Sequence, residues 1–182
     1  MLRTNLSSYD NGWYNPGAGF LKRVCWYFVN ACFFTSYFPI NRVKIVLLRL
    51  FGAKIGKGVI VKPAVNIKYP WKLEVGNHVW IGEKVWIDNL AQVTLGDHVC
   101  LSQGSFILCG NHNYKKTSFD LMTAPVFLHE GVWIGAKAVI CPGVICFSHA
   151  VLTVGSVANK NLEAYAIYQG NPAIRIKERM EE

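Results

Sequence analysis

The sequence has few charged residues, and acidic residues are almost absent from its first 73 positions. Charged residues make up 16% of the 182 residues, whereas 52% are hydrophobic. Asp10 is the single acidic residue before position 74, and eleven Lys and Arg residues share that stretch. Nucleic-acid binding explains this excess poorly, because the aromatic residues there lie in apolar runs and no nucleic-acid-binding module is recognisable. The stretch suits either an anionic membrane surface or a capping element with solvated Lys and Arg.

The chain also lacks a Cys-x-x-Cys pair and an apolar run of membrane-spanning length. The first absence argues against zinc ligation by the six cysteines. No secretory signal precedes them, so we expect a cytoplasmic protein whose cysteines are small buried hydrophobes. The most apolar stretch, residues 20–38, contains Asn30, Thr35 and Ser36. Its uninterrupted part is shorter than the roughly 18 residues that a span needs.

Residues 20–51 instead predict a helical cap made of two helices. Pro39 can begin the second helix, and Gly52 is placed to end it. One face of that helix is predicted to be apolar, with Ile40, Val43, Leu47 and Leu50. Before the cap, residues 1–18 indicate an irregular lead that Tyr9, Trp13 and Tyr14 tie to the body. We therefore divide the chain into a lead and cap, residues 1–51, and a repeat domain, residues 52–182.

A six-residue repeat dominates from Val75 to His112. The first sixes are Val75-Gly-Asn-His-Val-Trp and Ile81-Gly-Glu-Lys-Val-Trp, and the pattern restarts at Leu95-Gly-Asp-His-Val-Cys. An aliphatic residue opens each six, and a small or β-branched residue follows four places later. Each six is one short strand plus a turn, and three sixes form one coil of a mainly β, parallel β-helix. Starts at Ile55, Val75 and Leu95 give coils of 20 residues. Glycines serve turns where a Cβ would clash or φ is positive: Gly76, Gly82, Gly96 and Gly135.

The repeat is interrupted after His112 and resumes at Leu128. The intervening loop, residues 113–127, is polar and has no six-residue pattern. A loop of this length inside a regular solenoid is usually functional. The repeat fades after residue 158, and the tail is predicted to end in a short α-helix.

Several segments resemble those of the hexapeptide-repeat acyltransferases, and in particular the WcaF-like O-acetyltransferases of colanic acid and exopolysaccharide synthesis. They are residues 47–56, Tyr69-Pro-Trp-Lys-Leu, Gly110-Asn-His-Asn-Tyr, Cys141-Pro-Gly-Val and Gly170-Asn-Pro-Ala. The resemblance implies that the β-helix is left-handed. The repeat itself does not give the hand, and ordinary parallel crossovers are right-handed. It further implies a homotrimer with sites between protomers. The implied activity is acetyl transfer from acetyl-CoA to a sugar hydroxyl of a surface polysaccharide, free or lipid-linked. The basic, apolar N-terminus would then bring the enzyme to the inner face of the membrane.

Acetyl transfer to a hydroxyl needs a base, and histidine suits that role. His78 and His98 lie one coil apart at outward turn positions and should stack, and His149 has the same place in its six. All three are typical of solvated turns, and His129 is equally unremarkable. His112 differs, because it follows Gly110 and opens the loop. In galactoside- and maltose-type acetyltransferases, which the chain resembles here, this position holds the catalytic base.

The resemblance also assigns binding residues. Asp88 and Asn89 both match the acceptor-positioning residue one coil below the base, and the sequence does not decide between them. The Ala136 amide would receive the thioester oxyanion, and no metal is required. Trp133, Val154, Gly155 and Ser156 would line the pantetheine groove. Lys160, Arg175 and Lys177 would contact the coenzyme A phosphates.

Two other functions compete with this hypothesis. A metal hydratase of the γ-carbonic-anhydrase type needs three converging histidines, and His112 is expected on a different edge from His78 and His98. A noncatalytic repeat scaffold needs no intact Gly-Asn-His segment. The sequence does not identify the acceptor sugar or the acyl group. It also leaves open whether the acceptor group is a hydroxyl or an amine.

Overall fold

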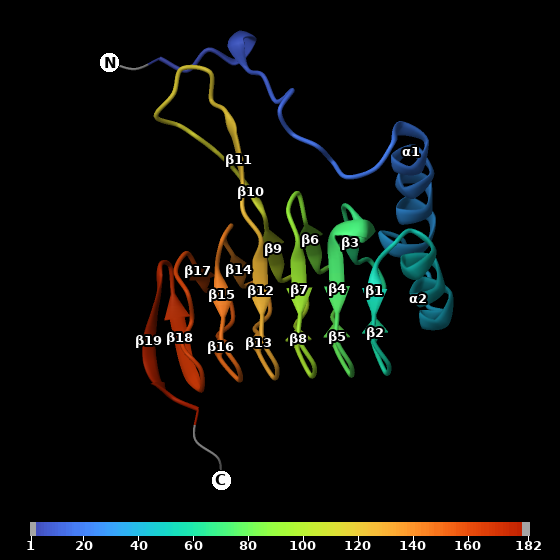
Figure 1. The fold of residues 1–182 in the computed structure, drawn as a ribbon. Coiled ribbons are helices and arrows are strands. Elements are labelled where there is room, and N and C mark those ends of the chain that lie inside the picture. Colours follow the sequence, from blue (N-terminus) through green and yellow to red (C-terminus); the bar gives the residue numbers. More distant parts are fainter. Residues whose placement is uncertain (1–2, 180–182) are drawn as a thin grey trace.

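The repeats form short parallel strands that stack into three flat sheets. In the computed structural model, which describes residues 3–179, the coils stand side by side between a helical cap and a C-terminal hairpin (Figure 1). The first sheet contains β1 (Lys54–Ile55), β4 (Leu73–Val75), β7 (Val93–Leu95), β12 (Val126–Leu128) and β15 (Ile145–Cys146). The second contains β2 (Ile60–Val61), β5 (Trp80–Ile81), β8 (Cys100–Leu101), β13 (Trp133–Ile134), β16 (Val151–Leu152), β18 (Ala166–Gly170) and β19 (Ala173–Glu178). The third contains β3 (Asn66–Ile67), β6 (Trp86–Asp88), β9 (Phe106–Leu108), β14 (Val139–Ile140) and β17 (Val157–Ala158).

The strand register confirms the 20-residue coil. Ile55 pairs with Val75, and Val75 pairs with Leu95. Leu95 pairs with Leu128 across the interruption, and Leu128 pairs with Cys146, so the coil after the interruption is shorter. The aliphatic residues that open the sixes form the core, as Ile81, Ile87 and Leu101 show by their near-complete burial. Each such side chain contributes about 1.5–3 kcal/mol through burial.

The turn glycines are required by close backbone approach. A Cβ on Gly76 would lie 2.8 Å from the carbonyl carbon of Gly96, and one on Gly135 would lie 2.6 Å from the nitrogen of Val154. The positive φ falls two residues later in the turn, at 56° in His78. The first of the two reasons predicted for these glycines is therefore confirmed.

The helical cap satisfies the open edge of the first coil with side chains. It consists of α1 (Phe20–Val29), the π-helical turn η2 (Asn30–Phe34) and α2 (Asn41–Leu50). Trp26 Nε1 donates to the Ile67 carbonyl at 2.8 Å, and Asn41 bonds the Val59 carbonyl and the Val61 amide at 2.9 and 2.8 Å. An uncapped strand edge would leave these groups unpaired. The predicted cap over residues 20–51 is confirmed.

Two details of the second helix were predicted wrongly. It begins at Asn41, two residues after Pro39. Its buried face carries Lys44 and Leu48, whereas Ile40 and Leu50 are exposed. Lys44 is buried because its ammonium donates to the Lys62 carbonyl at 2.9 Å, and burial lowers its pKa. A hydrophobic pattern cannot reveal a lysine that binds strand-edge carbonyls.

The tail forms a β-hairpin, so the predicted C-terminal α-helix is wrong. Strands β18 and β19 pair antiparallel, and β18 continues the second sheet beside β16. Without this hairpin, the last coil would leave an unpaired strand edge. Strand β18 pairs with that edge. Gly170, at φ +104°, begins the tight turn between the two strands.

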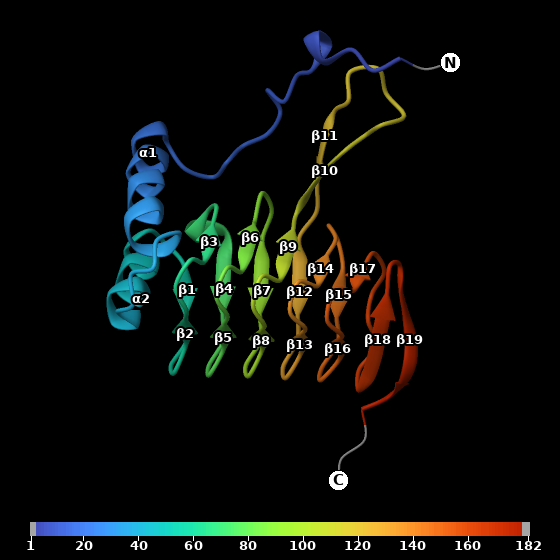
Figure 2. The same cartoon turned by 180° about the vertical axis from the view of Figure 1, so that it is seen from behind.

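The N-terminal lead runs along one edge of the β-helix to the interruption, as both views show (Figures 1 and 2). It includes the 3₁₀ turn η1 (Leu6–Ser8), and the Asn5 amide donates to the Thr117 carbonyl at 2.8 Å. Tyr14 Oη donates to the Leu90 carbonyl at 2.7 Å, so this predicted contact is confirmed. Trp13 is 60% exposed. Within residues 3–179, no helix has the length and apolar character to cross a membrane.

None of the six cysteines forms a disulfide. Cys109 and Cys146 are buried, as the sequence predicted, but Cys25 and Cys32 are exposed on the cap.

A 3₁₀ turn, η3 (Pro70–Lys72), links the third sheet to the first in the first coil and carries Trp71.

Candidate functional site

His112 lies on a hairpin that projects from the β-helix. Strands β10 (Gly110–His112) and β11 (Leu121–Thr123) pair antiparallel, so the loop predicted over 113–127 is partly ordered by strand pairing. The ring of His112 stacks on Phe119 with centroids 4.5 Å apart. Its Nδ1 lies 2.9 Å from the Phe119 carbonyl oxygen. In neutral imidazole this contact places the proton on Nδ1 and leaves Nε2 as the acceptor.

A cleft of about 600 Å³ opens beside His112. The N-terminal lead forms one wall with Tyr9 and Tyr14, and Arg23 of α1 extends it. Lys68, Tyr69 and Leu90 supply part of the opposite wall. The Tyr9 ring lies 5.7 Å from the His112 ring, centroid to centroid. The site therefore depends on the lead as well as on the repeats.

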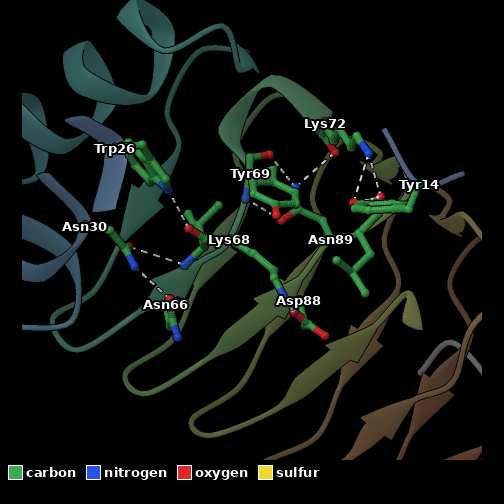
Figure 3. Close-up of polar contacts among 11 residues, drawn as sticks. Tyr14, Trp26, Asn30, Asn66, Lys68, Tyr69, Lys72, Asp88 and Asn89 are labelled. Carbon is green, nitrogen blue, oxygen red and sulfur yellow. Dashed lines mark hydrogen bonds and ion pairs between the residues drawn. The ribbon is translucent and has the colours of Figure 1, made fainter. Parts of the chain in front are cut away.

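Asp88 and Asn89 have different surroundings, although they are neighbours in sequence (Figure 3). Asp88 Oδ1 lies 2.9 Å from Lys68 Nζ and has no other hydrogen-bond donor among the described residues. Asn89 is fully buried, and its amide accepts from the Tyr69 nitrogen at 2.9 Å. It also donates to the carbonyls of Tyr69 and Lys72, at 2.6 and 3.1 Å. The amide of Asn89 is thus committed to the backbone, whereas Asp88 lines a neighbouring cleft rather than the one beside His112.

Lys72 and Tyr14 form a partly buried polar cluster next to Asp88 and Asn89. Lys72 Nζ donates to the Leu90 carbonyl at 2.7 Å and to Tyr14 Oη at 3.1 Å. Burial lowers the pKa of Lys72. Burial, reinforced by the nearby Tyr69 and Asp88, raises the pKa of Tyr14 well above its ordinary range. Tyr14 is therefore a neutral phenol that fixes the lead against this edge.

Three residues assigned to the coenzyme A groove do meet in one groove. Trp133, Ala136 and Val154 line a cleft of about 390 Å³ together with Ser102 and Gln103. Trp133 Nε1 donates to Ser102 Oγ at 2.9 Å, which fixes the indole. Among residues 3–179, no acceptor lies on the Ala136 amide, so this N–H can donate to a ligand. Gly155 flanks the groove, where its amide donates to the Ala136 carbonyl at 2.9 Å.

Ser156 and the three predicted cations lie elsewhere. Ser156 is 1% exposed, and its Oγ accepts from the Gly170 amide at 3.0 Å, so it braces the tail behind the groove. Arg175 forms ion pairs with Glu163 and Glu178. Lys160 is exposed, and Lys177 lies on the exposed C-terminal strand.

His112 and the groove at Ala136 are on different edges of the β-helix. His112 follows β9 and precedes β12, so it lies at the edge between the third and first sheets. Ala136 lies between β13 and β14, at the edge between the second and third sheets. A whole sheet separates them within one chain.

The other histidines lie on the remaining edge, between the first and second sheets. The rings of His78 and His98 are 5.3 Å apart, with an interplanar angle of 12°, as predicted. His149 stacks on Tyr165. His112 does not join them, and residues 3–179 contain no group of three or more His, Cys, Asp or Glu side chains that could hold a metal ion.

Sequence reasoning missed Arg23, Lys68, Tyr69 and Phe119. The coil length could have found two of them, because Lys68 and Tyr69 stand 20 residues before Asp88 and Asn89. Phe119 and Arg23 reach the site from the hairpin and the cap, which the repeat does not place.

Comparisons with known proteins were made by family, sequence and structure. No protein-family model matches the chain. It is 37% identical over 166 residues, 91% of each chain, to WcaF of Escherichia coli K12, which is named as an acetyltransferase of colanic acid biosynthesis. It is 25% identical to the galactoside O-acetyltransferase of the same organism, over 72% of this chain and 66% of that one.

The solved structures support the fold. A maltose O-acetyltransferase from Clostridium difficile superposes with a TM-score of 0.75 at 21% identity, over 88% of both chains. A hexapeptide-repeat acetyltransferase from Vibrio cholerae gives 0.73 at 23% identity, over 78% of this chain and 82% of that one. These likenesses confirm the left-handed parallel β-helix.

Proposed function

Because the chain belongs to the WcaF-type hexapeptide-repeat acetyltransferases, we propose that it transfers an acetyl group from acetyl-CoA to a sugar hydroxyl during synthesis of an exopolysaccharide or another surface polysaccharide. The observation that carries the proposal is the contact of His112 Nδ1 with the Phe119 carbonyl at 2.9 Å. It fixes the tautomer in which Nε2 can accept a proton, as a general base must. The names of the curated relatives supply the acetyl donor and the sugar acceptor.

The reaction proceeds by direct attack. His112 Nε2 takes the proton of the sugar hydroxyl while the sugar oxygen bonds to the thioester carbonyl carbon. The Ala136 amide donates to the oxyanion of the tetrahedral intermediate. The carbon–sulfur bond then breaks, and the coenzyme A sulfur leaves and takes the proton from His112. Asp88, rather than the fully bonded Asn89, orients the acceptor.

Donor binding follows from the groove. Trp133, Val154 and Gly155 would hold the pantetheine arm, and Lys160 and Lys177 would meet the phosphates. Arg175 could join them only by leaving Glu163 and Glu178. Ser156 supports the groove from behind through the Gly170 amide.

The active form is a homotrimer in this proposal. The separation of His112 from Ala136 supports it, because a base and a donor groove on different edges meet when copies pack side by side. Exposed tryptophans on the flat sheets support it too: Trp80, Trp86 and Trp133 are 56%, 44% and 48% exposed. Such aromatic side chains are typical of subunit interfaces.

The cap holds the enzyme at the inner face of the cytoplasmic membrane, where a lipid-linked acceptor would be found. Helix α1 exposes Phe20, Leu21, Tyr27 and Phe28, each by 61–77%. No acidic residue occurs between positions 11 and 73, so the surroundings suit anionic lipid. Leu21→Ser with Phe28→Ser should abolish co-flotation with anionic vesicles, whereas Ile176→Ser, at the far end, should not. Unchanged flotation of the double variant would contradict membrane binding.

Calorimetric titration with acetyl-CoA tests the function without a known acceptor. Wild type and His112→Ala should bind acetyl-CoA equally, because His112 is not part of the donor groove. Only wild type should then acetylate a sugar in an acceptor screen. Failure of both proteins to bind acetyl-CoA would overturn the proposal and favour a noncatalytic scaffold.

A further inference from the structure

The cleft beside His112 continues into a second cleft of about 410 Å³ beneath helix α1. The two share three lining residues, Arg23, Lys68 and Tyr69, which form their junction. The second cleft is otherwise largely apolar and aromatic, with Trp26, Tyr27, Ala31 and Trp86. A sugar at His112 would therefore have the junction beside it and an apolar cleft beyond.

The junction has an excess of positive charge. Arg23 Nε is buried and has no hydrogen-bond partner, and Arg23 forms no ion pair among residues 3–179. Lys68 is paired with Asp88, which is the single carboxylate among the residues that line the two clefts. Two cations thus face one anion. A partly buried guanidinium without an acceptor is unfavourable until an anion pairs with it.

We infer that Arg23, with Lys68, binds an anionic group of the sugar acceptor, either a phosphate ester or a carboxylate. The inference rests on the proposed function, since it takes the sugar to lie at His112. The guanidinium fork suits both groups, because it donates two parallel hydrogen bonds to a pair of oxyanion atoms. A phosphate at the end of the sugar would also direct any apolar aglycone into the cleft beneath α1. Arg23 is in this view an acceptor-specificity residue contributed by the cap.

Ligand binding to the full chain tests this inference with three probes. The three probes share one sugar and differ in charge. Galactose 1-phosphate carries a phosphate, galacturonate carries a carboxylate, and methyl galactoside is neutral. Wild type should bind at least one anionic probe about tenfold to hundredfold more tightly than the neutral one. The probe preferred distinguishes the two anions.

Substitutions locate the effect. Arg23→Gln should remove the preference, Arg23→Lys should retain part of it, and Arg42→Gln should leave it unchanged. Arg42 is the matched control because it is exposed on the cap and forms no ion pair among the described residues. Equal binding of all three probes by wild type, or an undiminished preference in Arg23→Gln, would overturn the inference. Acetyl-CoA binding is a separate readout, so its loss would refute the proposed function rather than the anion site.

Discussion

Two edges of the same β-helix carry histidines in opposite circumstances. On the edge between the first and second sheets, called here the ladder edge, His78 and His98 repeat the same turn with φ of 56° and 58° and stack on each other. The edge between the third and first sheets is called here the interrupted edge. There His112 leaves the repeat, and its Nδ1–H donates to the Phe119 carbonyl. The ladder histidines bond through their backbone amides, to Lys57 and Asn77. The difference teaches that a histidine acquires specific side-chain and carbonyl partners where the repeat stops and tertiary contacts replace the next coil, which is why the proposed function assigns the base to this edge.

The largest effect should separate the two edges directly. His112→Ala should lower kcat by about 10²–10⁴-fold, the range for loss of a general base. His98→Ala on the ladder edge should change kcat by less than about twofold, because its ring faces solvent and contacts only His78 among aromatic rings. Transfer of the labelled acetyl group from acetyl-CoA to the acceptor measures kcat for both variants. Similar losses in the two variants would contradict the comparison.

A smaller effect should separate Asp88 from Asn89 on the interrupted edge. Asn89→Ala should lower the free energy of unfolding by about 2–3 kcal/mol, because it leaves buried backbone groups of Tyr69 and Lys72 unpaired. Asp88→Asn should change that free energy by less than about 1 kcal/mol, because asparagine keeps the shape of the side chain and an oxygen that can accept from Lys68, whose side chain is 39% exposed. It should instead lower kcat/KM about tenfold.

Urea unfolding and acceptor kinetics on both variants measure this pair of effects. The opposite pattern, with Asp88→Asn unfolding easily and Asn89→Ala folded but inactive, would show that Asn89 positions the acceptor.

The smallest effect concerns the pH dependence of stability at Cys109. Burial raises the pKa of this thiol from 9.0 to about 11. The folded pKa exceeds the unfolded one, so the buried neutral thiol stabilises the fold fully below pH 9 and loses this contribution between about pH 9 and 11. The stability advantage of wild type over Cys109→Ala should shrink by about 1–2 kcal/mol between pH 8 and 10.5.

The exposed Cys25 is the matched control on the cap. The difference in unfolding free energy between wild type and Cys25→Ala should not change over the same pH range. A constant wild-type advantage over Cys109→Ala would show that this thiol is not shielded from water.

The regular part of the molecule could be predicted because its period determines both the core and the lateral contacts. Residues 20 apart become neighbours, as Lys54 and Glu74 do at 2.6 Å and Trp86 and Phe106 do with stacked rings. The same spacing explains the Lys68–Asp88 pair and the bond from Tyr69 to Asn89. His112 was recognisable through its place at the interruption and its family resemblance.

The rest depended on tertiary contacts that no repeat encodes. Arg23 reaches the junction because Trp26 and Asn30 bond the first coil and fix helix α1 against it. Lys44 is buried by carbonyls of a different segment. The tail forms a strand pair because β18 pairs with the open edge of β16 and so continues the second sheet. Local helix propensity carries no information about that open edge.

The most direct test of the shared site is complementation between two inactive variants. His112→Ala removes the base from the interrupted edge, and Ala136→Trp fills the donor groove on the other edge. Mixed trimers, formed by co-expression and purified through two affinity tags, should recover about a third of wild-type activity, because a cyclic trimer that contains both variants has an intact base facing an intact groove at one of its three sites. Recovery at that level would establish an active site built from two copies. Mixed trimers as inactive as the parent variants would contradict the account.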